Sequence, residues 1–229
     1  MKENDDEGKE SININPPKKH NKKGKDLKII IVGDSGTGKT SFVNKYIHNK
    51  FAETYSPTIG TSFEYKIIKI NDIMYRLQFL DIAVKDRNPE ITGIFCKNTN
   101  GIILCCEVNK YQTKENTIKW KESIEKVIDI KDIPIIMIEN KCDLLGKDDY
   151  NKDIYELKNF VENNNINKCF RTSALNGYGV EESILFLANQ IVGTPEQNPE
   201  QNEFRRDSIV LNRDSHKSSK RSSKKKNCC

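Results

Sequence analysis

Apolar residues occur in short runs separated by polar segments in the middle of the chain, whereas both ends are polar. Continuous apolar runs are typical of strands buried in a parallel sheet, and apolar residues three and four positions apart are typical of helices. The pattern predicts six strands, over residues 27–32, 62–70, 73–80, 101–108, 133–138 and 168–172. It also predicts four helices, over residues 40–51, 113–129, 153–163 and 180–192.

Two local signals refine these elements. Asn71 and Asp72 separate two β-rich runs, which predicts a β-hairpin. Thr113 is a candidate N-terminal cap for the helix over 113–129. Strands that alternate with helices predict an α/β fold with a six-stranded, mainly parallel sheet and helices on both faces. In such sheets, ligands bind in loops that follow the carboxyl ends of the strands.

The polar ends lower the mean hydropathy of the whole chain to −0.71. Residues 1–25 and 194–229 contain too few apolar residues to form a core, which predicts disordered tails around one domain at 26–193. No apolar run reaches the ~20 residues that a membrane-spanning helix needs, and the N-terminus lacks the apolar core of a signal peptide. The five internal cysteines are expected to be reduced packing residues: Cys96, Cys105, Cys106, Cys142 and Cys169.

A phosphate-binding loop follows the first predicted strand and opens the first helix. The eight residues match the pattern G-x-x-x-x-G-K-[ST]: Gly33, Asp34, Ser35, Gly36, Thr37, Gly38, Lys39 and Thr40. Glycines let the backbone amides turn toward phosphate oxygens, and the helix N-terminus favours the negative charge. Lys39 is expected to pair with the β- and γ-phosphates and the Thr40 hydroxyl to bind Mg²⁺. The alternative is a glycine-rich turn without a ligand, which the matching context disfavours.

A second motif, with Asn140, Lys141 and Asp143, follows the strand over 133–138. Asn offers a donor and an acceptor, and an Asp carboxylate can accept two N–H donors. Guanine presents N1–H and N2–H₂ as such a pair, whereas adenine does not. The motif alone is weak, but after a phosphate loop and at a strand end it predicts guanine recognition.

These motifs give the chain, from about residue 26 to residue 192, a clear resemblance to the small GTPases of the Ras superfamily, and specifically to Rab proteins. Further Rab-like features are residues 55–60, Phe63, the Trp120-Lys121 pair and a terminal Cys-Cys. The stretch Asp81-Ile82-Ala83 is similar to the Rab thirty-two and thirty-eight branch. The resemblance implies an effector region formed by Tyr55, Ser56, Pro57, Thr58, Ile59, Gly60, Thr61, Ser62 and Phe63.

The same resemblance implies roles for residues outside the two motifs. Ser173, Ala174 and Leu175 correspond to the third guanine loop, in which the Ala174 N–H faces the base oxygen and Leu175 replaces the usual Lys. Phe51 matches an aromatic residue that packs edge-on against guanine. Thr58 matches the threonine that binds Mg²⁺ and senses the γ-phosphate, and Asp81 supports the ion from outside its direct coordination sphere.

The chain departs from the family at two catalytic positions. Val84 stands where the family has a glycine whose N–H meets the γ-phosphate, and Lys85 replaces the glutamine that orients the attacking water. A β-branched residue is stiff, and an ammonium has no acceptor for a water proton. We expect slow intrinsic GTP hydrolysis, although activating proteins that bring their own glutamine and arginine can still assist it. The alternative is that context compensates and turnover is ordinary.

The C-terminal tail is basic. Residues 205–229 hold nine Lys and Arg and two Asp, which accounts for the formal net charge of +5 of the whole chain. A basic tail can be merely solvated or can bind nucleic acid, but Cys228 and Cys229 favour a membrane. By resemblance, both cysteines are geranylgeranylated. Two prenyl chains and a polybasic segment anchor a protein stably, where one chain would not.

The resemblance predicts a membrane-anchored switch in vesicle trafficking that uses GTP or GDP and Mg²⁺. It implies an exchange factor, a GTPase-activating protein, prenylation escort and GDP-dissociation inhibitor proteins, and effectors as partners, with no nucleic acid. The expected location is the cytoplasmic face of an intracellular membrane, with a cytosolic pool. The alternative is a pseudo-GTPase that acts as a constitutive membrane scaffold. A nucleotide kinase shares the phosphate loop, but residues 140–143 and 173–174 argue against one.

Overall fold

The computed structural model describes residues 25–54, 56–58, 60–83, 94–146 and 154–193. Val84, Lys85, Tyr55 and Ile59 lie outside the described residues, as do the tails apart from Lys25. The disorder of the tails and the prenylation of the terminal cysteines therefore stay predictions.

The predicted six-stranded sheet is present, and its order is β2-β3-β1-β4-β5-β6. All neighbouring strands are parallel except β2 and β3, which are antiparallel. The strands are β1 (Lys25–Val32), β2 (Gly60–Ile70), β3 (Ile73–Ala83), β4 (Gly101–Glu107), β5 (Ile135–Asn140) and β6 (Lys168–Arg171). The helices are α1 (Lys39–His48), α3 (Tyr111–Glu125), the short 3₁₀ helix η1 (Cys142–Leu144), α4 (Ile154–Asn163) and α5 (Val180–Val192).

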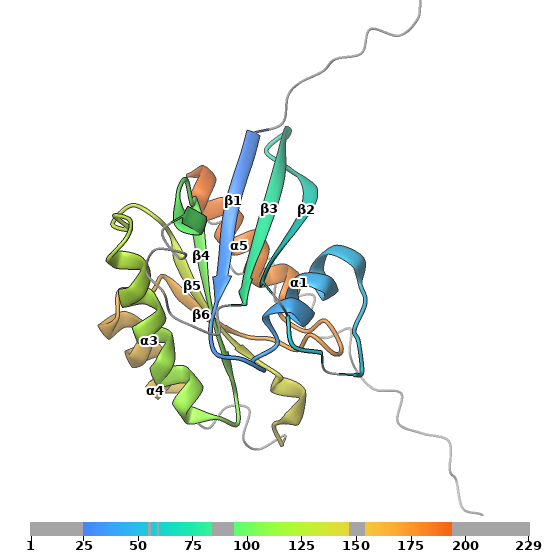
Figure 1. Cartoon of the computed structure of the whole chain (residues 1–229), viewed down its shortest axis with the longest axis vertical. Helices are drawn as coiled ribbons and strands as arrows, with labels where there is room; N and C mark the ends of the chain where they lie inside the picture. The colour runs from blue at the N-terminus through green and yellow to red at the C-terminus, as the bar shows by residue number, and fades with distance from the viewer. Residues whose placement is uncertain (1–24, 55, 59, 84–93, 147–153, 194–229) are drawn as a thin grey trace, which may run out of the picture. The chain divides into compact units, whose positions relative to one another are not determined.

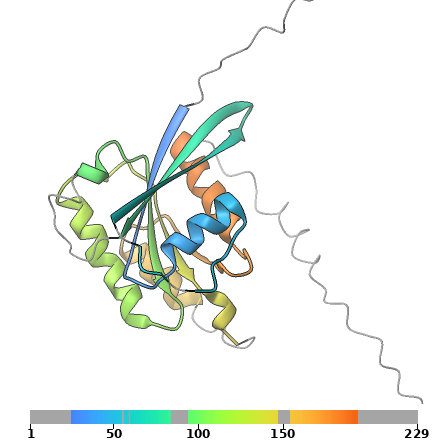
Figure 2. The ribbon, with the colours of Figure 1, turned by 45° about the vertical axis from the view of Figure 1, so that its right-hand side comes forward.

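Helices cover both faces of the sheet, as the α/β pattern predicted. Successive residues of β1 point to opposite faces, so Ile29 and Ile31 join one core and Ile30 and Val32 the other. The first core includes apolar residues of α1 and α5, and the second includes residues of α3 and α4. Figure 1 shows α3 and α4 together on one side of the sheet. In Figure 2, α1 and α5 lie beside each other on the other side, drawn in blue and orange.

The predicted hairpin joins β2 to β3. Asn71 and Asp72 have φ angles of 47° and 63°, and Ile70 pairs with Ile73 across the turn. Positive φ at both central residues is the geometry of a type I′ turn, for which Asn and Asp are suited. The turn fixes the register of the whole hairpin.

The predicted ends of two helices are wrong. The helix α1 stops at His48, three residues early, because Asn49 adopts a left-handed conformation with φ 53° and its N–H bonds to the Lys45 carbonyl at 3.1 Å. The helix α3 runs from Tyr111 to Glu125 and not over 113–129. Thr113 lies inside its first turn and donates to the Lys110 carbonyl at 2.7 Å, so it is not the cap.

Smaller differences affect the strands. β5 begins at Ile135 and extends to Asn140, so the strand itself carries the first residue of the second motif to the sheet edge. The five internal cysteines are free and four of them are buried, as expected for packing residues. Within the described residues, every helix is too short or too polar to cross a bilayer.

Candidate nucleotide-binding site

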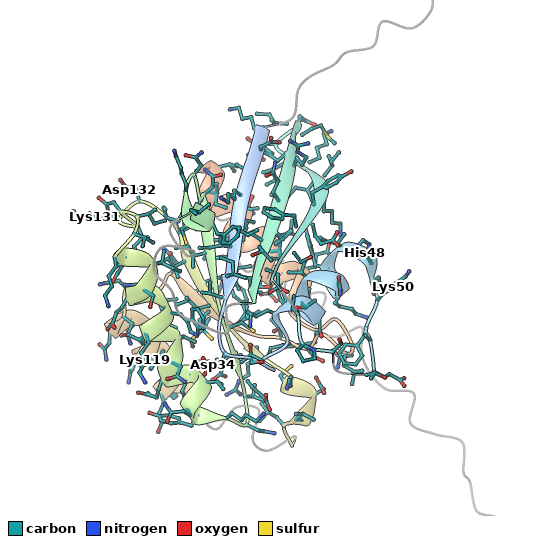
Figure 3. All side chains as sticks on the ribbon, in the orientation of Figure 1. Asp34, His48, Lys50, Lys119, Lys131 and Asp132 are labelled. Atoms are coloured by element: carbon teal, nitrogen blue, oxygen red, sulfur yellow. The ribbon has the colours of Figure 1, made fainter. Side chains whose placement is uncertain are left out.

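A cavity of about 570 Å³ opens at the carboxyl edge of the sheet, where the sequence predicted a ligand. Figure 3 shows Asp34 at this edge, below the end of β1 and beside α3, while Lys131 and Asp132 lie at the opposite edge. The lining comes from four segments of the chain: Gly33, Ser35, Gly36, Gly38, Lys39, Thr40, Ser41, Asn44, Phe51, Ala52, Glu53, Thr54, Ser56, Pro57, Thr58, Asn140, Lys141, Asp143, Leu144, Ala174 and Leu175.

The phosphate loop curls around the Lys39 side chain. Lys39 is buried, and its Nζ donates to the Gly33 carbonyl at 2.8 Å and to the Asp34 carbonyl at 3.0 Å. A cation that lines the cavity and is held by two carbonyls is suited to meet an anion there. The Thr37 hydroxyl closes the loop by donating to the Asp34 carbonyl at 2.9 Å.

Gly38 ends the loop and begins α1. Its φ is 90°, and a Cβ at this position would collide with the Asn140 side-chain amide. Only glycine therefore combines the left-handed conformation with this close approach. The first turn of α1 is thus free to direct its N–H groups at the cavity.

The Asp34 side chain does not line the cavity but ties the loop to α3. Trp120 Nε1 donates to Asp34 Oδ1 at 2.9 Å, and Asn116 Nδ2 donates to Oδ2 at 2.6 Å. Asn116 also accepts a hydrogen bond from Lys119 Nζ at 3.0 Å. These two hydrogen bonds to Asp34 therefore anchor the phosphate loop to α3.

Three oxygen-bearing side chains meet beside Lys39. The Thr40 and Thr58 hydroxyls lie 2.7 Å apart, and Thr40 also donates to Asp81 Oδ2. Burial raises the pKa of Asp81 above its ordinary value, against the opposing effects of Thr40 and Lys39. Asp81 Oδ1 is buried without a hydrogen-bond partner in the described part of the chain. Oxygen donors with one unsatisfied carboxylate oxygen fit a Mg²⁺ ion, which keeps several waters and shares phosphate oxygens.

Asn140 ties the motif after β5 to its neighbours. Its Nδ2 donates to the Thr37 carbonyl at 2.9 Å, while its Oδ1 accepts from the Ala174 N–H and the Thr172 hydroxyl, each at 3.2 Å. Asn140 is only 1% exposed. Its donor and acceptor groups therefore bond within the protein, joining the phosphate loop to the loop after β6.

Asp143 lines the same cavity as the phosphate loop. It is exposed, and its Oδ1 accepts a hydrogen bond from the Ser173 hydroxyl. Ser173 is buried and also accepts from the Asn176 N–H at 3.3 Å. Leu175 and Phe51 line the cavity with 50% and 39% of their surfaces exposed, so both offer apolar contact to a planar ring.

Lys141 has an internal partner that the sequence did not predict. Its φ is 65°, and its Nζ donates to Glu107 Oε2 at 2.7 Å. Lys110 Nζ donates to the same oxygen at 3.0 Å. Burial disfavours the Glu107 carboxylate, but the hydrogen bonds from both lysines outweigh it and hold its pKa below the ordinary value.

Most residues predicted to bind nucleotide line one cavity, and the rest support it from behind. Asp34, Thr37, Asp81 and Ser173 contact lining residues without lining it themselves. Phe63, from the predicted effector region, is 66% exposed on β2. Sequence reasoning missed the lining residues Ser41, Asn44, Ala52, Glu53, Thr54 and Leu144, which flank the motifs. The supports Glu107 and Asn116 have no local sequence signal.

A parallel sheet with a phosphate loop after β1 and an Asn-Lys-x-Asp motif after β5 defines a P-loop G domain. A family model described as "Ras family" matches residues 28–193, and the chain belongs to this family of GTP hydrolases, as a Rab GTPase near the Rab-32 branch.

The relatives support this placement. Ras-related protein Rab-32A of Dictyostelium discoideum is 35% identical over 170 residues, which cover 72% of this chain and 77% of the relative. Ras-related protein Rab-32 of Homo sapiens is 28% identical over 208 residues, or 89% of each chain. Ras-related protein RABG3a of Arabidopsis thaliana is 32% identical over 165 residues, which cover 71% of this chain and 80% of the relative.

Proposed function

We propose that this protein is a membrane-anchored guanine-nucleotide switch of the Rab type that regulates vesicle trafficking. The observation that carries the proposal is the cavity at the carboxyl edge of the sheet, which Lys39 and Asp143 both line. A nucleoside di- or triphosphate carries an anion at one end and a base with hydrogen-bond donors at the other. The cavity is lined by a cation that suits the phosphates and by a carboxylate that suits the donors of the base.

Base selection is assigned to Asp143, because its exposed carboxylate can accept from guanine N1–H and N2–H₂. Calorimetry with the purified chain should give heat with GDP and GTP and none with ADP. Asp143→Asn replaces an acceptor by a donor, so it should weaken GDP binding and improve binding of xanthosine diphosphate. A protein that gives no heat with either guanine nucleotide would end the proposal.

Magnesium is assigned to the oxygens of Thr40 and Thr58, with Asp81 behind them. The bound ion would neutralise charge on the phosphate oxygens. Thr58 would be the residue that distinguishes GTP from GDP, because it belongs to the segment before β2 that also carries the predicted effector residues. Thr58→Ala should leave GDP binding nearly unchanged and weaken the preference for Mg²⁺–GTP.

Slow intrinsic hydrolysis is the expected consequence of Val84 and Lys85, because Lys85 cannot accept a proton from the attacking water. A single-turnover assay should give a rate below the Ras-like ~10⁻⁴ s⁻¹. The double variant Val84→Gly with Lys85→Gln should be faster at the same GTP occupancy. A wild-type rate at or above that reference would contradict this part of the proposal.

A constitutive scaffold is the second candidate, and the same two positions favour it. A scaffold should bind GTP without turnover even when a GTPase-activating protein is added, whereas a switch should turn over with one. The two functions therefore separate in one assisted-hydrolysis measurement.

Anchoring is assigned to prenylated Cys228 and Cys229 together with the basic residues at 217–226. The expected location is the cytoplasmic face of an intracellular membrane, reached through escort and GDP-dissociation inhibitor proteins. A tagged protein with Cys228→Ser and Cys229→Ser should become cytosolic. Unchanged membrane localisation of this variant would refute lipid anchoring.

A further inference from the structure

Two oppositely charged side chains are buried directly behind the base-recognition loops, which are residues 140–143 and 173–175. Arg171 Nε lies 3.2 Å from Glu139 Oε2, and the two side chains are 9% and 8% exposed. Glu139 precedes Asn140 at the end of β5, and Arg171 is the last residue of β6. The two residues are register partners on neighbouring parallel strands.

We propose that the Glu139–Arg171 ion pair is a positioning device for guanine recognition, which holds the two base-recognition loops in one fixed arrangement. The proposal rests on the guanine-nucleotide site described above. Neither residue lines the cavity, so both act through the loops that follow them.

The backbone around the pair passes this constraint to both loops. The Thr172 N–H, next to Arg171, donates to the Glu139 carbonyl at 2.9 Å. The Thr172 carbonyl in turn accepts from the Cys142 N–H at 3.0 Å, inside the loop that carries Asp143. The Ser173 hydroxyl donates to the Asp143 carboxylate. A shift of β6 against β5 would therefore change the distance between these two residues.

The chemistry of the pair suits positioning better than plain stability. Met137 and Cys169, two residues earlier on the same strands, pack with the apolar core on this face. Buried ion pairs are often no more stabilising than apolar residues of similar volume, because desolvation offsets the attraction. Such a pair constrains the relative position of its two strands, because a hydrogen-bonded charge pair tolerates little displacement, whereas apolar contacts can slide.

The test is the release of a fluorescent GDP analogue from the full chain, compared with its thermal melting. Glu139→Gln removes one charge and leaves Arg171 buried. The double variant Glu139→Met with Arg171→Met removes both charges and keeps the volume. We expect about tenfold faster GDP release from the double variant, the equivalent of one weakened hydrogen bond to the base, while its melting temperature stays near that of wild type.

Competition with inosine diphosphate adds a readout that altered stability alone would not move. Inosine lacks the N2 amine, so a displaced Asp143 should reduce the GDP-over-IDP affinity ratio in the variants. Arg171→Lys keeps the positive charge but loses the planar guanidinium with its fixed N–H donors. The same measurements are made on this variant if the other variants do not fold. Wild-type release and an unchanged ratio in any folded variant would overturn the proposal.

A matched control lies at the other end of the sheet. Asp26 and Arg76 are also register partners on neighbouring parallel strands, with Arg76 Nη2 at 2.6 Å from Asp26 Oδ2, but both are about half exposed. Asp26→Asn should leave GDP release and the GDP-over-IDP ratio unchanged. A wild-type protein that binds no GDP would refute the proposed function, whereas binding with unaffected variants would refute only the positioning role.

Discussion

Trp120 connects α3 to the phosphate loop, and Trp120→Phe measures how much that connection contributes. The variant loses the Nε1 donor that lies 2.9 Å from Asp34 Oδ1 but keeps the Asn116 donor at 2.6 Å from Oδ2. A hydrogen bond to a charged group contributes about 1.5–3 kcal/mol. Asp34 is half-buried, so water can partly replace the lost donor, and we expect a value near the lower limit. Lost packing around the buried ring should bring the destabilisation to about 2 kcal/mol.

For a domain of this size, about 2 kcal/mol corresponds to a melting temperature lower by about 4–8 °C. Trp120 is the only tryptophan, so unfolding should be followed by circular dichroism and not by intrinsic fluorescence. A double-mutant cycle with Asp34→Ala isolates the pair, and we expect a coupling of at least about 1 kcal/mol together with faster GDP release from each single variant. Effects that add within about 0.5 kcal/mol would refute the anchoring argument.

Three further predictions concern other parts of the molecule. Gly38→Ala should abolish GDP binding in calorimetry and lower the free energy of urea unfolding by at least about 1–3 kcal/mol. The reason is that Gly38 has a φ of 90° and an alanine Cβ there would collide with Asn140. Unchanged GDP binding would contradict this prediction. Glu107 contributes stability above its ordinary pKa of 4.5, because the lysine hydrogen bonds hold its folded-state pKa lower despite burial. This contribution should disappear as the pH falls through that lowered pKa, so Glu107→Gln should show a smaller acid-dependent loss of stability than wild type. Replacing Lys224, Lys225 and Lys226 by Gln should weaken binding of the prenylated protein to anionic vesicles by about 3 kcal/mol and leave neutral vesicles unaffected.

The strands and the general architecture were predictable because burial determines both. Three strands, β1, β4 and β5, are buried along most of their lengths, and their residues read as nearly continuous apolar runs. The helix ends were less predictable, because single conformations set them. Nothing in the apolar pattern indicates that Asn49 adopts a left-handed backbone conformation. Nor does it indicate that the Thr113 hydroxyl donates to the Lys110 carbonyl and accepts a hydrogen bond from the Glu107 N–H.

The candidate site was predictable where its residues form contiguous motifs. The loop at 33–40 and the motif at 140–143 both come to the same cavity, as expected for loops at the carboxyl edge. Its supports were not predictable, because they join residues far apart in the chain. Trp120 lies 86 residues from Asp34, and Glu107 lies 34 residues from Lys141. Such pairs become apparent only when β4 and α3 are placed beside the loops.

The two halves of the site are physically one unit, because they share the Asn140 side chain. One amide donates to the phosphate loop at Thr37 and accepts from the base-recognition loop at Ala174. Since Asn140 is almost fully buried, an unpaired donor or acceptor there would cost about 1–3 kcal/mol, so separation of either loop is opposed by both bonds. A ligand that holds the phosphate loop in place therefore also favours the arrangement that presents Asp143 and the Ala174 N–H. Under the proposed function, anion binding at the phosphate loop would therefore support base selection by Asp143 through the Asn140 side chain.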